Sequence, residues 1–434
     1  MQRRDRGVLR QGEGERVLAP AGADHEDADL PGLSGLSGFA GHERRSYVAW
    51  VLALAVGAAV VGAWEGGFTD LHVYRYAGQA VLDGASAYDA DDPVTGLPFT
   101  YPPFAAVLMV PLALLPGWLA ASLWTGASAA CLAGSVLVAL RASGRRAPGW
   151  LVALLALVAL GLEPVWQSLS FGQVNTVLML AILVDVVRPE RRWSGVLVGI
   201  AAGIKLTPLV FVALLVLVGR RTAACRAALA FAATVAIGYA AMPAGATSYW
   251  TDGLLDAGRV GPPALAHNQS LFGALTRLLD GPPSTLVWVT VAAPLALAVL
   301  GVGALCWRRG DRVLGTCLAA LAMLLASPVS WSHHWVWAVP VAVALWERTR
   351  WAATAWTAVF VARPVVWPPW GEGRELGWGA ADHLAGNAYT LAALALALGV
   401  GVGVSAAGAA RPPARAPDPP RRPTSAPPRS PRAP

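Results

Sequence analysis

The chain has 434 residues, of which 56% are hydrophobic and only 14% are charged. An ordinary soluble domain carries about 25% charged residues, so the composition excludes one and indicates a membrane protein with many spans. The net charge of +7 does not indicate nucleic-acid binding, because the arginines stand in short clusters between apolar runs and in the two tails.

Two polar tails flank the apolar part of the chain. Residues 1–46 are rich in Gly, Asp, Glu and Arg, and residues 409–434 are rich in Pro, Arg, Ala and Ser. Neither tail contains periodic apolar residues, so we expect both to be disordered and dispensable for chemistry. Residues 1–46 are also too long and too acidic for a standard signal sequence. The first apolar run is therefore expected to remain as an uncleaved anchor.

Arginine clusters mark one side of the membrane. They occupy residues 141–146, 188–192, 220–226, 308–312 and 348–350. The positive-inside rule makes this side cytoplasmic, together with both tails. The loops between the clusters are poor in Arg and carry polar, acidic and aromatic residues, which predicts that they face the exterior. These loops are residues 65–103, 163–175, 243–284, 327–334 and 363–387.

Joining the two sides predicts about twelve membrane crossings in a domain of residues 47–408. The expected crossings are 47–64, 117–140, 150–162, 176–187, 193–204, 207–219, 224–242, 285–306, 313–327, 335–346, 351–362 and 388–406. Their even number agrees with two cytoplasmic ends. Residues 193–219 lie between two cytoplasmic clusters and must turn back, with a natural break at Lys205-Leu-Thr-Pro208. Residues 104–116 are short and bounded by prolines, which favours a re-entrant or interfacial helix.

The first exterior loop places a carboxylate at the mouth of the first span. Asp70 follows the apolar run 47–64, which is about long enough to cross a bilayer core. It can act on a substrate that lies partly in lipid, or it can be a plain interfacial residue. Tyr74 and Tyr101 follow in the same loop, where aromatic residues either anchor the chain at the interface or grip a lipid or sugar. For the D-x-D pattern at residues 89–92, a solvated turn is favoured over a metal site.

The second exterior loop and the expected interruption of the helix at residues 205–208 carry further polar groups at membrane depth, where such groups are functional candidates. Gln173 and Asn175 can bind hydroxyls or phosphate oxygens, or they can cap the next helix. Lys205 is the only lysine and has no acid next to it in the sequence. Its ammonium is therefore expected to bind an anion, and a phosphate is the obvious one. The alternative is a lysine that extends its side chain to the membrane surface.

Two later motifs add amides and histidines. Asn268 and Gln269 precede an apolar helix, where they either bind a ligand or cap the helix. His333 and His334 are adjacent, and on a helix adjacent residues point to different faces. Hydrogen bonding or proton transfer is therefore favoured over metal binding, and neither a metal nor a cofactor is expected. The four cysteines lack metal-ligand spacing and are expected to be buried: Cys131, Cys225, Cys306 and Cys317.

Together these motifs resemble glycosyltransferase family 87, the actinobacterial mannosyltransferases of the GT-C superfamily that depend on polyprenyl-phosphate-mannose. The matching motifs are D-L-x-V-Y at 70–74, F-T-Y-P-P at 99–103, G-Q-V-N at 172–175, G-I-K-L-T-P at 203–208, N-Q-S-L at 268–271 and S-P-V-S-W-S-H-H-W at 327–335. Their order and spacing cover residues 60–390. The resemblance implies an all-α polytopic GT-C fold with a large first extracytoplasmic loop that carries short interfacial helices.

The resemblance also implies an activity and assigns site residues. It implies α-mannosyl transfer to a glycolipid or lipoglycan, such as a phosphatidylinositol mannoside or lipomannan, at the extracytoplasmic face of a bacterial plasma membrane. Asp70 matches the catalytic base, Lys205 the intramembrane lysine, and His333 with His334 the histidine pair of the family. Ser332 departs from the pattern, because an acidic residue is expected before the histidine pair. This departure puts a second carboxylate at the site in doubt.

The hypothesis for the mechanism is a single displacement with inversion. Asp70 takes the proton of the acceptor hydroxyl, and Lys205 stabilises the departing polyprenyl phosphate. Further substrate contacts are expected from Gln173, Asn175, Asn268, Gln269, Tyr74 and Tyr101. The expected partners are the lipid-linked donor, the acceptor and membrane lipids, and not nucleic acid.

Two alternatives remain open. The first is a transferase for another polyprenyl-phosphate sugar, such as arabinose, because nothing in the sequence separates one sugar from another. The second is a lipid or sugar transporter, which should place polar groups near the midplane and often shows an internal repeat. No strong repeat is visible, and the unusual polar residues gather on one side, with the depth of Lys205 uncertain. The sequence therefore favours the transferase.

Overall fold

The computed structural model describes residues 41–64, 67–188, 190–254 and 257–409. Within these ranges the chain is built of α-helices and short helical turns, and the only strand-like pairing is one antiparallel bridge between Asn268 and Trp331. The predicted all-α class is therefore confirmed. The expected disordered tails lie outside the described residues, except for residues 41–46, which already belong to the first helix.

Among the described residues, five helices are long and apolar enough to cross a membrane alone. They are α1 (Gly41–Trp64), α4 (Gly117–Ala142), α10 (Arg221–Ala241), α13 (Thr285–Arg308) and α18 (Ala388–Ala409). A sixth span results if α5 (Gly149–Ala159) and α6 (Glu163–Ser170), which meet at 86°, count as one broken helix. Each expected crossing coincides with a helix, but the other helices are short, so the count of twelve stays a prediction.

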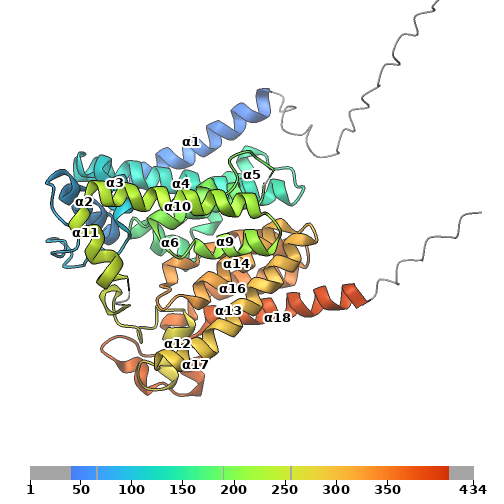
Figure 1. Cartoon of the computed structure of the whole chain (residues 1–434). Helices are drawn as coiled ribbons and strands as arrows, with labels where there is room; N and C mark the ends of the chain where they lie inside the picture. The colour runs from blue at the N-terminus through green and yellow to red at the C-terminus, as the bar shows by residue number, and fades with distance from the viewer. Residues whose placement is uncertain (1–40, 65–66, 189, 255–256, 410–434) are drawn as a thin grey trace, which may run out of the picture.

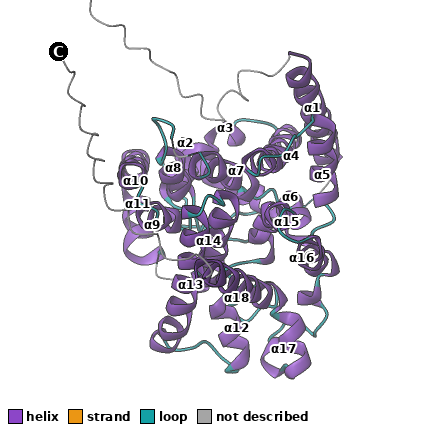
Figure 2. Cartoon of the chain, turned by 90° about the vertical axis from the view of Figure 1, so that its right-hand side faces the viewer, coloured by secondary structure: helices purple, strands orange, loops and turns teal. Residues whose placement is uncertain are grey.

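The long helices α4, α10 and α18 run roughly side to side in Figure 1, whereas α1 and α13 are inclined to them; α10 is seen nearly end-on in Figure 2. The start of α1 and the end of α18 both lie at the right of Figure 1. Several short helices gather at the opposite end, toward the left and lower left. They are α2 (Thr69–Leu82), α3 (Pro103–Ala113), α11 (Pro243–Ser248), α12 (Leu271–Leu278) and α17 (Ala380–Gly386). The two ends of the molecule therefore differ in architecture.

The first large loop carries two short helices, as expected. α2 presents Leu71, Val73 and Tyr74 to the interior, and α3 follows after Pro102 as a helix of only 11 residues. The two helices pack closely at Gly78, where an added Cβ would lie 2.6 Å from the Met109 carbonyl oxygen. This packing fixes the start of α2 relative to the rest of the molecule.

The predicted break at Lys205 is present. α8 (Val196–Ile204) ends at Lys205, whose backbone is extended with φ −145° and ψ 129°. α9 (Leu209–Leu217) begins directly after Pro208, which starts the helix without needing a backbone N–H partner. Lys205 therefore projects from irregular backbone between two helices.

The chain turns back at this break. α8 and α10 run parallel, because Gly195 lies against Ala223 and Gly199 against Ala227. α9 connects two parallel neighbours and must run in the opposite direction. The hairpin that the arginine clusters predicted for residues 193–219 is therefore confirmed.

The centre of the molecule is α14 (Arg312–Ala326), whose side chains are buried on every face from Val313 to Leu325. Such a helix is apolar all round because other helices surround it. Further helices of the same bundle are α7 (Asn175–Val186), the 3₁₀ turn η4 (Ser332–Trp337), α15 (Ala338–Trp346) and α16 (Arg350–Ala362). Of the cysteines, Cys306 and Cys317 are buried as expected, whereas Cys225 is exposed on α10, which corrects that expectation.

Candidate functional site

Asp70 lies in the first turn of α2, a position where the helix dipole favours negative charge. The backbone N–H groups of Asp70 and Leu71 donate to the Phe171 carbonyl at 2.9 and 3.2 Å, which ties α2 to the loop before α7. Gly172 permits this approach, because it has φ +70° and an added Cβ would lie 2.7 Å from the Leu71 side chain. The loop between α6 and α7 thus holds the start of α2, which carries Asp70.

Three buried polar side chains stand beside Asp70. The Tyr101 hydroxyl donates to Gln173 Oε1 at 3.0 Å, and the Tyr74 hydroxyl lies 3.1 Å from the same oxygen and 2.9 Å from the Tyr101 hydroxyl. Because the hydroxyls occupy the amide oxygen, the NH₂ of Gln173 is free to donate to the Asp70 carboxylate. Tyr74 and Tyr101 therefore orient Gln173, and Gln173 orients Asp70.

The environment of Asp70 makes it a better base than an exposed aspartate. Burial raises the pKa of Asp70 from 3.8 to about 6. The hydrogen bond from Gln173 and the charge of Lys205 act in the opposite direction and are the smaller effects. At neutral pH the carboxylate is ionised and still has appreciable affinity for a proton.

Lys205 reaches the same region from the α8–α9 break. Its Nζ lies 2.9 Å from His334 Nε2 and 3.4 Å from Asn175 Oδ1, and it stands 5.5 Å from the centre of the Tyr101 ring. An ammonium has only donors, so His334 Nε2 must accept, which requires a neutral imidazole with its proton on Nδ1. No carboxylate lies within ion-pair distance of Lys205 in the described part of the chain. Its charge therefore lacks a direct counter-ion.

A small cavity of about 30 Å³ adjoins Lys205, Asn175 and His334. A volume of this size has room for about one water molecule. The Lys205 ammonium is thus in contact with His334 and Asn175, and the cavity beside it is small.

His333 has a buried nitrogen without a partner. Its ring packs edge-on against Phe171 at 5.4 Å and against His334 at 4.6 Å, and its carbonyl accepts from Asn175 Nδ2 at 2.9 Å. Nε2 of His333 forms no hydrogen bond with any described residue. Burial, with the nearby charges of Lys205 and His267, lowers the pKa of His333 well below its usual value. This nitrogen is therefore free to hydrogen-bond a water molecule or a ligand group.

A second carboxylate is present near the histidine pair, although Ser332 is not acidic. Glu163 comes from the start of α6 and accepts from the Ser332 hydroxyl at 2.6 Å and from the Tyr389 hydroxyl at 3.1 Å. The doubt raised by Ser332 is therefore corrected. The carboxylate is supplied from another part of the chain and reaches the site through the serine.

Asn268 and Gln269 form hydrogen bonds within the protein, which favours the structural alternative, and their contact with substrate stays a prediction. Neither side chain is exposed. Asn268 donates to the carbonyls of Pro263 and Pro328 and accepts from the Ser330 N–H, whereas Gln269 donates to the carbonyls of Ala266 and Gly386 and accepts from the Tyr389 N–H. These bonds use their polar groups and fix the loop that carries the histidines.

Arg277 supports the same region and was not predicted. It is fully buried on α12 and donates to the carbonyls of Ala264, Leu265 and Asn268, and to Asn387 Oδ1. The available signal in the sequence was its position, because it is an arginine on the side of the membrane that lacks arginine clusters. A buried guanidinium in this position holds several backbone carbonyls at once.

Comparison with known proteins gives a consistent result. The model of glycosyltransferase family 87 matches residues 99–328. A polyprenol-phosphate-mannose-dependent alpha-(1-2)-phosphatidylinositol pentamannoside mannosyltransferase of Mycobacterium tuberculosis is 39% identical, over 80% of this chain and 84% of its own. A protein of the same description from Mycolicibacterium smegmatis is 37% identical, over 76% and 83%.

A further relative from Mycolicibacterium smegmatis is described as an alpha-(1-2)-phosphatidylinositol mannoside mannosyltransferase with the same dependence. It is 36% identical, over 69% of this chain and 75% of its own. No solved structure gives a significant match to this chain.

Proposed function

This chain belongs to glycosyltransferase family 87 and is a membrane glycosyltransferase, and from that premise we propose that it transfers mannose from polyprenyl-phosphate-mannose to a phosphatidylinositol mannoside. The names of the relatives support this donor and this class of acceptor. The chain covers more than four fifths of the two pentamannoside-specific relatives, so the resemblance includes most of their length.

The observation that carries the proposal is a base and an anion-binding cation in one cluster. Asp70 is hydrogen-bonded by Gln173, and Lys205 lies close enough to affect the Asp70 charge without forming an ion pair with it. Transfer from a sugar phosphate needs both groups, one for the attacking hydroxyl and one for the leaving phosphate. A carrier that only moves a lipid across the membrane needs no such base.

The proposed reaction is a single displacement. The acceptor hydroxyl oxygen forms a bond to C1 of mannose while the bond from C1 to the phosphate oxygen breaks. The hydroxyl proton passes to Asp70, and the electron pair of the broken bond stays on the polyprenyl phosphate, where Lys205 stabilises the charge. Attack opposite the leaving group inverts the anomeric configuration.

The histidines and Asn175 complete the proposed phosphate site. His334 accepts from Lys205 and so fixes the direction of the ammonium. His333 offers its unpartnered Nε2 to a phosphate oxygen or a sugar hydroxyl. Asn175 contacts both Lys205 and the His333 backbone, and it keeps the two segments in register.

We propose that the reaction takes place at the extracytoplasmic face, with both termini in the cytoplasm. The arginine clusters support this orientation, because they lie in the segments that alternate with the site-bearing loops. Asp70 belongs to the loop after the first span, which follows a cytoplasmic tail in this orientation.

The test is a single-turnover assay with the purified full-length protein in detergent. We expect labelled mannose to pass from polyprenyl-phosphate-mannose to a phosphatidylinositol mannoside with inverted configuration. Detergent removes the two compartments, so a transporter would give no product. Preferential transfer from polyprenyl-phosphate-arabinose would replace mannose by a pentose in the proposal.

A further inference from the structure

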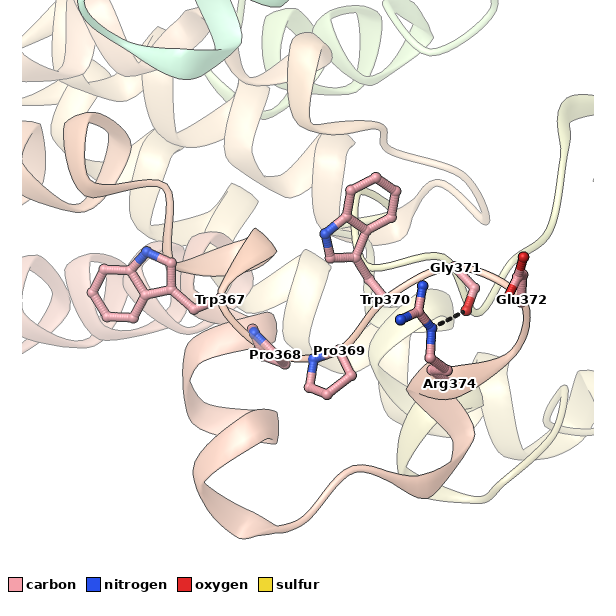
Figure 3. Close-up of a pocket in the computed structure, with 7 residues that line it drawn as sticks. All are labelled: Trp367, Pro368, Pro369, Trp370, Gly371, Glu372 and Arg374. Atoms are coloured by element: carbon pink, nitrogen blue, oxygen red, sulfur yellow. Dashed lines mark hydrogen bonds between the residues drawn. The ribbon is translucent and has the colours of Figure 1, made fainter.

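An open groove lies in the loop between α16 and α17, outside the cluster around Asp70. Its volume is about 710 Å³, within the range of small-molecule sites. Figure 3 shows two tryptophans, Trp367 and Trp370, on either side of Pro368 and Pro369, with Glu372 and Arg374 beyond. Trp367 is 67% exposed and Trp370 is 42% exposed, so both rings are available to a ligand.

Hydrogen bonds within the loop stabilise the shape of the groove. The Trp378 indole donates to the Pro369 carbonyl at 2.7 Å, and the buried Glu375 accepts from the Gly371 N–H at 2.8 Å. Arg374 Nε donates to the Gly371 carbonyl at 3.1 Å, which is the dashed line in Figure 3. These bonds fix the backbone on which Trp370 stands, and the Trp367 indole donates to the Ala362 carbonyl at 3.0 Å.

The backbone beside the rings is strained. Gly371, Glu372 and Gly373 have φ values of 80°, 56° and 79° in succession. A non-glycine residue such as Glu372 adopts this region rarely, and such strain is found at ligand clamps. The conformation places the Glu372 side chain at the edge of the groove.

The lining combines the two features that a sugar ring requires. A pyranose has an apolar face of C–H groups, which the negative face of an indole ring attracts, and a rim of hydroxyls, which need hydrogen-bond partners. In the described part of the chain the terminal nitrogens of Arg374 and the carboxylate of Glu372 form no hydrogen bond or ion pair. They are therefore free to bind hydroxyls.

The groove adjoins the segment that carries the histidine pair. The Trp370 ring packs edge-on against His267 at 5.0 Å. His267 directly precedes Asn268, whose backbone pairs with Trp331, two residues before His333. The groove and the histidine-bearing segment are therefore joined through residues 267 and 268.

We infer that this groove binds the mannose units already present on the acceptor and directs the acceptor hydroxyl toward Asp70. This inference rests on the proposed function for the identity of the acceptor. The occupant is an α-linked mannoside, and its lipid part stays in the membrane. Trp367 and Trp370 bind the sugar rings, whereas Glu372 and Arg374 bind their hydroxyls.

A membrane anchor is the competing role, because exposed tryptophans gather at membrane interfaces. Trp118 provides the matched control. It is 62% exposed at the start of α4 and does not line the groove. Replacing it removes an exposed indole without changing the groove.

The first test measures sugar binding without donor or transfer. Full-length protein in nanodiscs is examined by saturation-transfer NMR with methyl α-mannobioside, and with cellobiose as the control sugar. We expect a signal for the mannobioside with the wild type and with Trp118→Ala, a loss of more than about half of it with Trp370→Ala, and recovery with Trp370→Phe. A mannobioside signal that neither Trp367→Ala nor Trp370→Ala changes, or no signal with the wild type, overturns the inference.

The second test measures kinetics. Trp370→Ala should raise the KM for a phosphatidylinositol pentamannoside by about tenfold and leave the KM for the donor unchanged. An equal rise with Trp118→Ala would indicate membrane anchoring and contradict the inference. Because the NMR test needs no transfer, a wild type that binds mannobioside without transferring mannose would refute the proposed function and leave the groove assigned.

Discussion

Asp70 combines burial with few polar contacts, and this combination decides its chemistry. Gln173 and Lys205 favour the ionised form, but burial outweighs them and raises the pKa of Asp70 to about 6. A more solvated carboxylate would be a weaker base, and one paired directly with Lys205 would be weaker still. The separation of the two charges therefore suits the proposed roles of Asp70 as base and Lys205 as phosphate ligand.

The pH profile follows from this pKa. Asp70 must be ionised to accept a proton, so kcat/KM should be level above pH 7 and fall about tenfold per pH unit well below pH 6. An aspartate with its ordinary pKa would keep the rate level down to about pH 5. The measurement is the rate of mannose transfer by the purified enzyme from pH 4.5 to 8. A profile without an acid limb near pH 6 contradicts the assignment.

The sequence predicted which polar residues lie close together better than it predicted their hydrogen-bond partners. Asp70, Gln173, Asn175 and Lys205 lie together, as expected for groups that are costly at membrane depth. The bond between Ser332 and Glu163 joins residues 169 positions apart, and no local pattern predicts such a contact. The hydrogen bonds of Asn268 to backbone carbonyls could not be predicted either, because an amide before a helix is compatible both with a ligand site and with a structural role in the loop.

At the scale of elements, small residues position Lys205. α8 lies against α10 so closely that a Cβ on Gly199 would be 2.2 Å from the Ala227 carbonyl oxygen. Lys205 follows the end of α8, and its direction depends on where that helix ends. The arginine clusters and Pro208 predicted the hairpin, but the close approach of the two helices depends on side-chain volumes that periodicity does not show.

Gly199→Ala tests this arrangement. The added methyl should push α8 away from α10, at a cost of about 1–3 kcal/mol, and displace Lys205. We expect at least a tenfold loss of transfer rate and a raised KM for the donor, with the protein still inserted in the membrane. Gly301→Ala is the control, because nothing lies within 4 Å of its added Cβ. Wild-type kinetics for Gly199→Ala would show that this packing does not position the lysine.

At the scale of the whole molecule, charge distribution predicted the architecture better than hydropathy predicted the number of spans. Every expected crossing coincides with a helix, yet in the described ranges only five helices are long enough to cross alone. Short helices such as α8 and α9 are stabilised by packing against neighbouring helices, and a single sequence does not reveal those neighbours. The groove around Trp370 was also missed, although its lining residues are neighbours in the sequence, because the left-handed turn at residues 371–373 that shapes it has no periodic pattern.

Accessibility of single cysteines tests the proposed orientation. Val94 is 69% exposed in the first loop, and Arg146 is exposed in the first arginine cluster. In a Cys225→Ser background, which removes the exposed native thiol, Val94→Cys should react with an impermeant maleimide in intact spheroplasts. Arg146→Cys should react only after lysis. The reverse pattern would place the catalytic cluster in the cytoplasm.

The central claim is that Asp70 is the base of a mannosyl transfer, and its most direct test is the single-turnover rate of Asp70→Asn. The amide keeps the size of the side chain and cannot accept the proton, so we expect a loss of about 10²- to 10⁴-fold. Asp83→Asn is the matched control, since Asp83 is an exposed aspartate at the other end of α2 and should retain the wild-type rate. Donor binding should persist in both variants. Transfer by Asp70→Asn at the rate of Asp83→Asn would contradict the account.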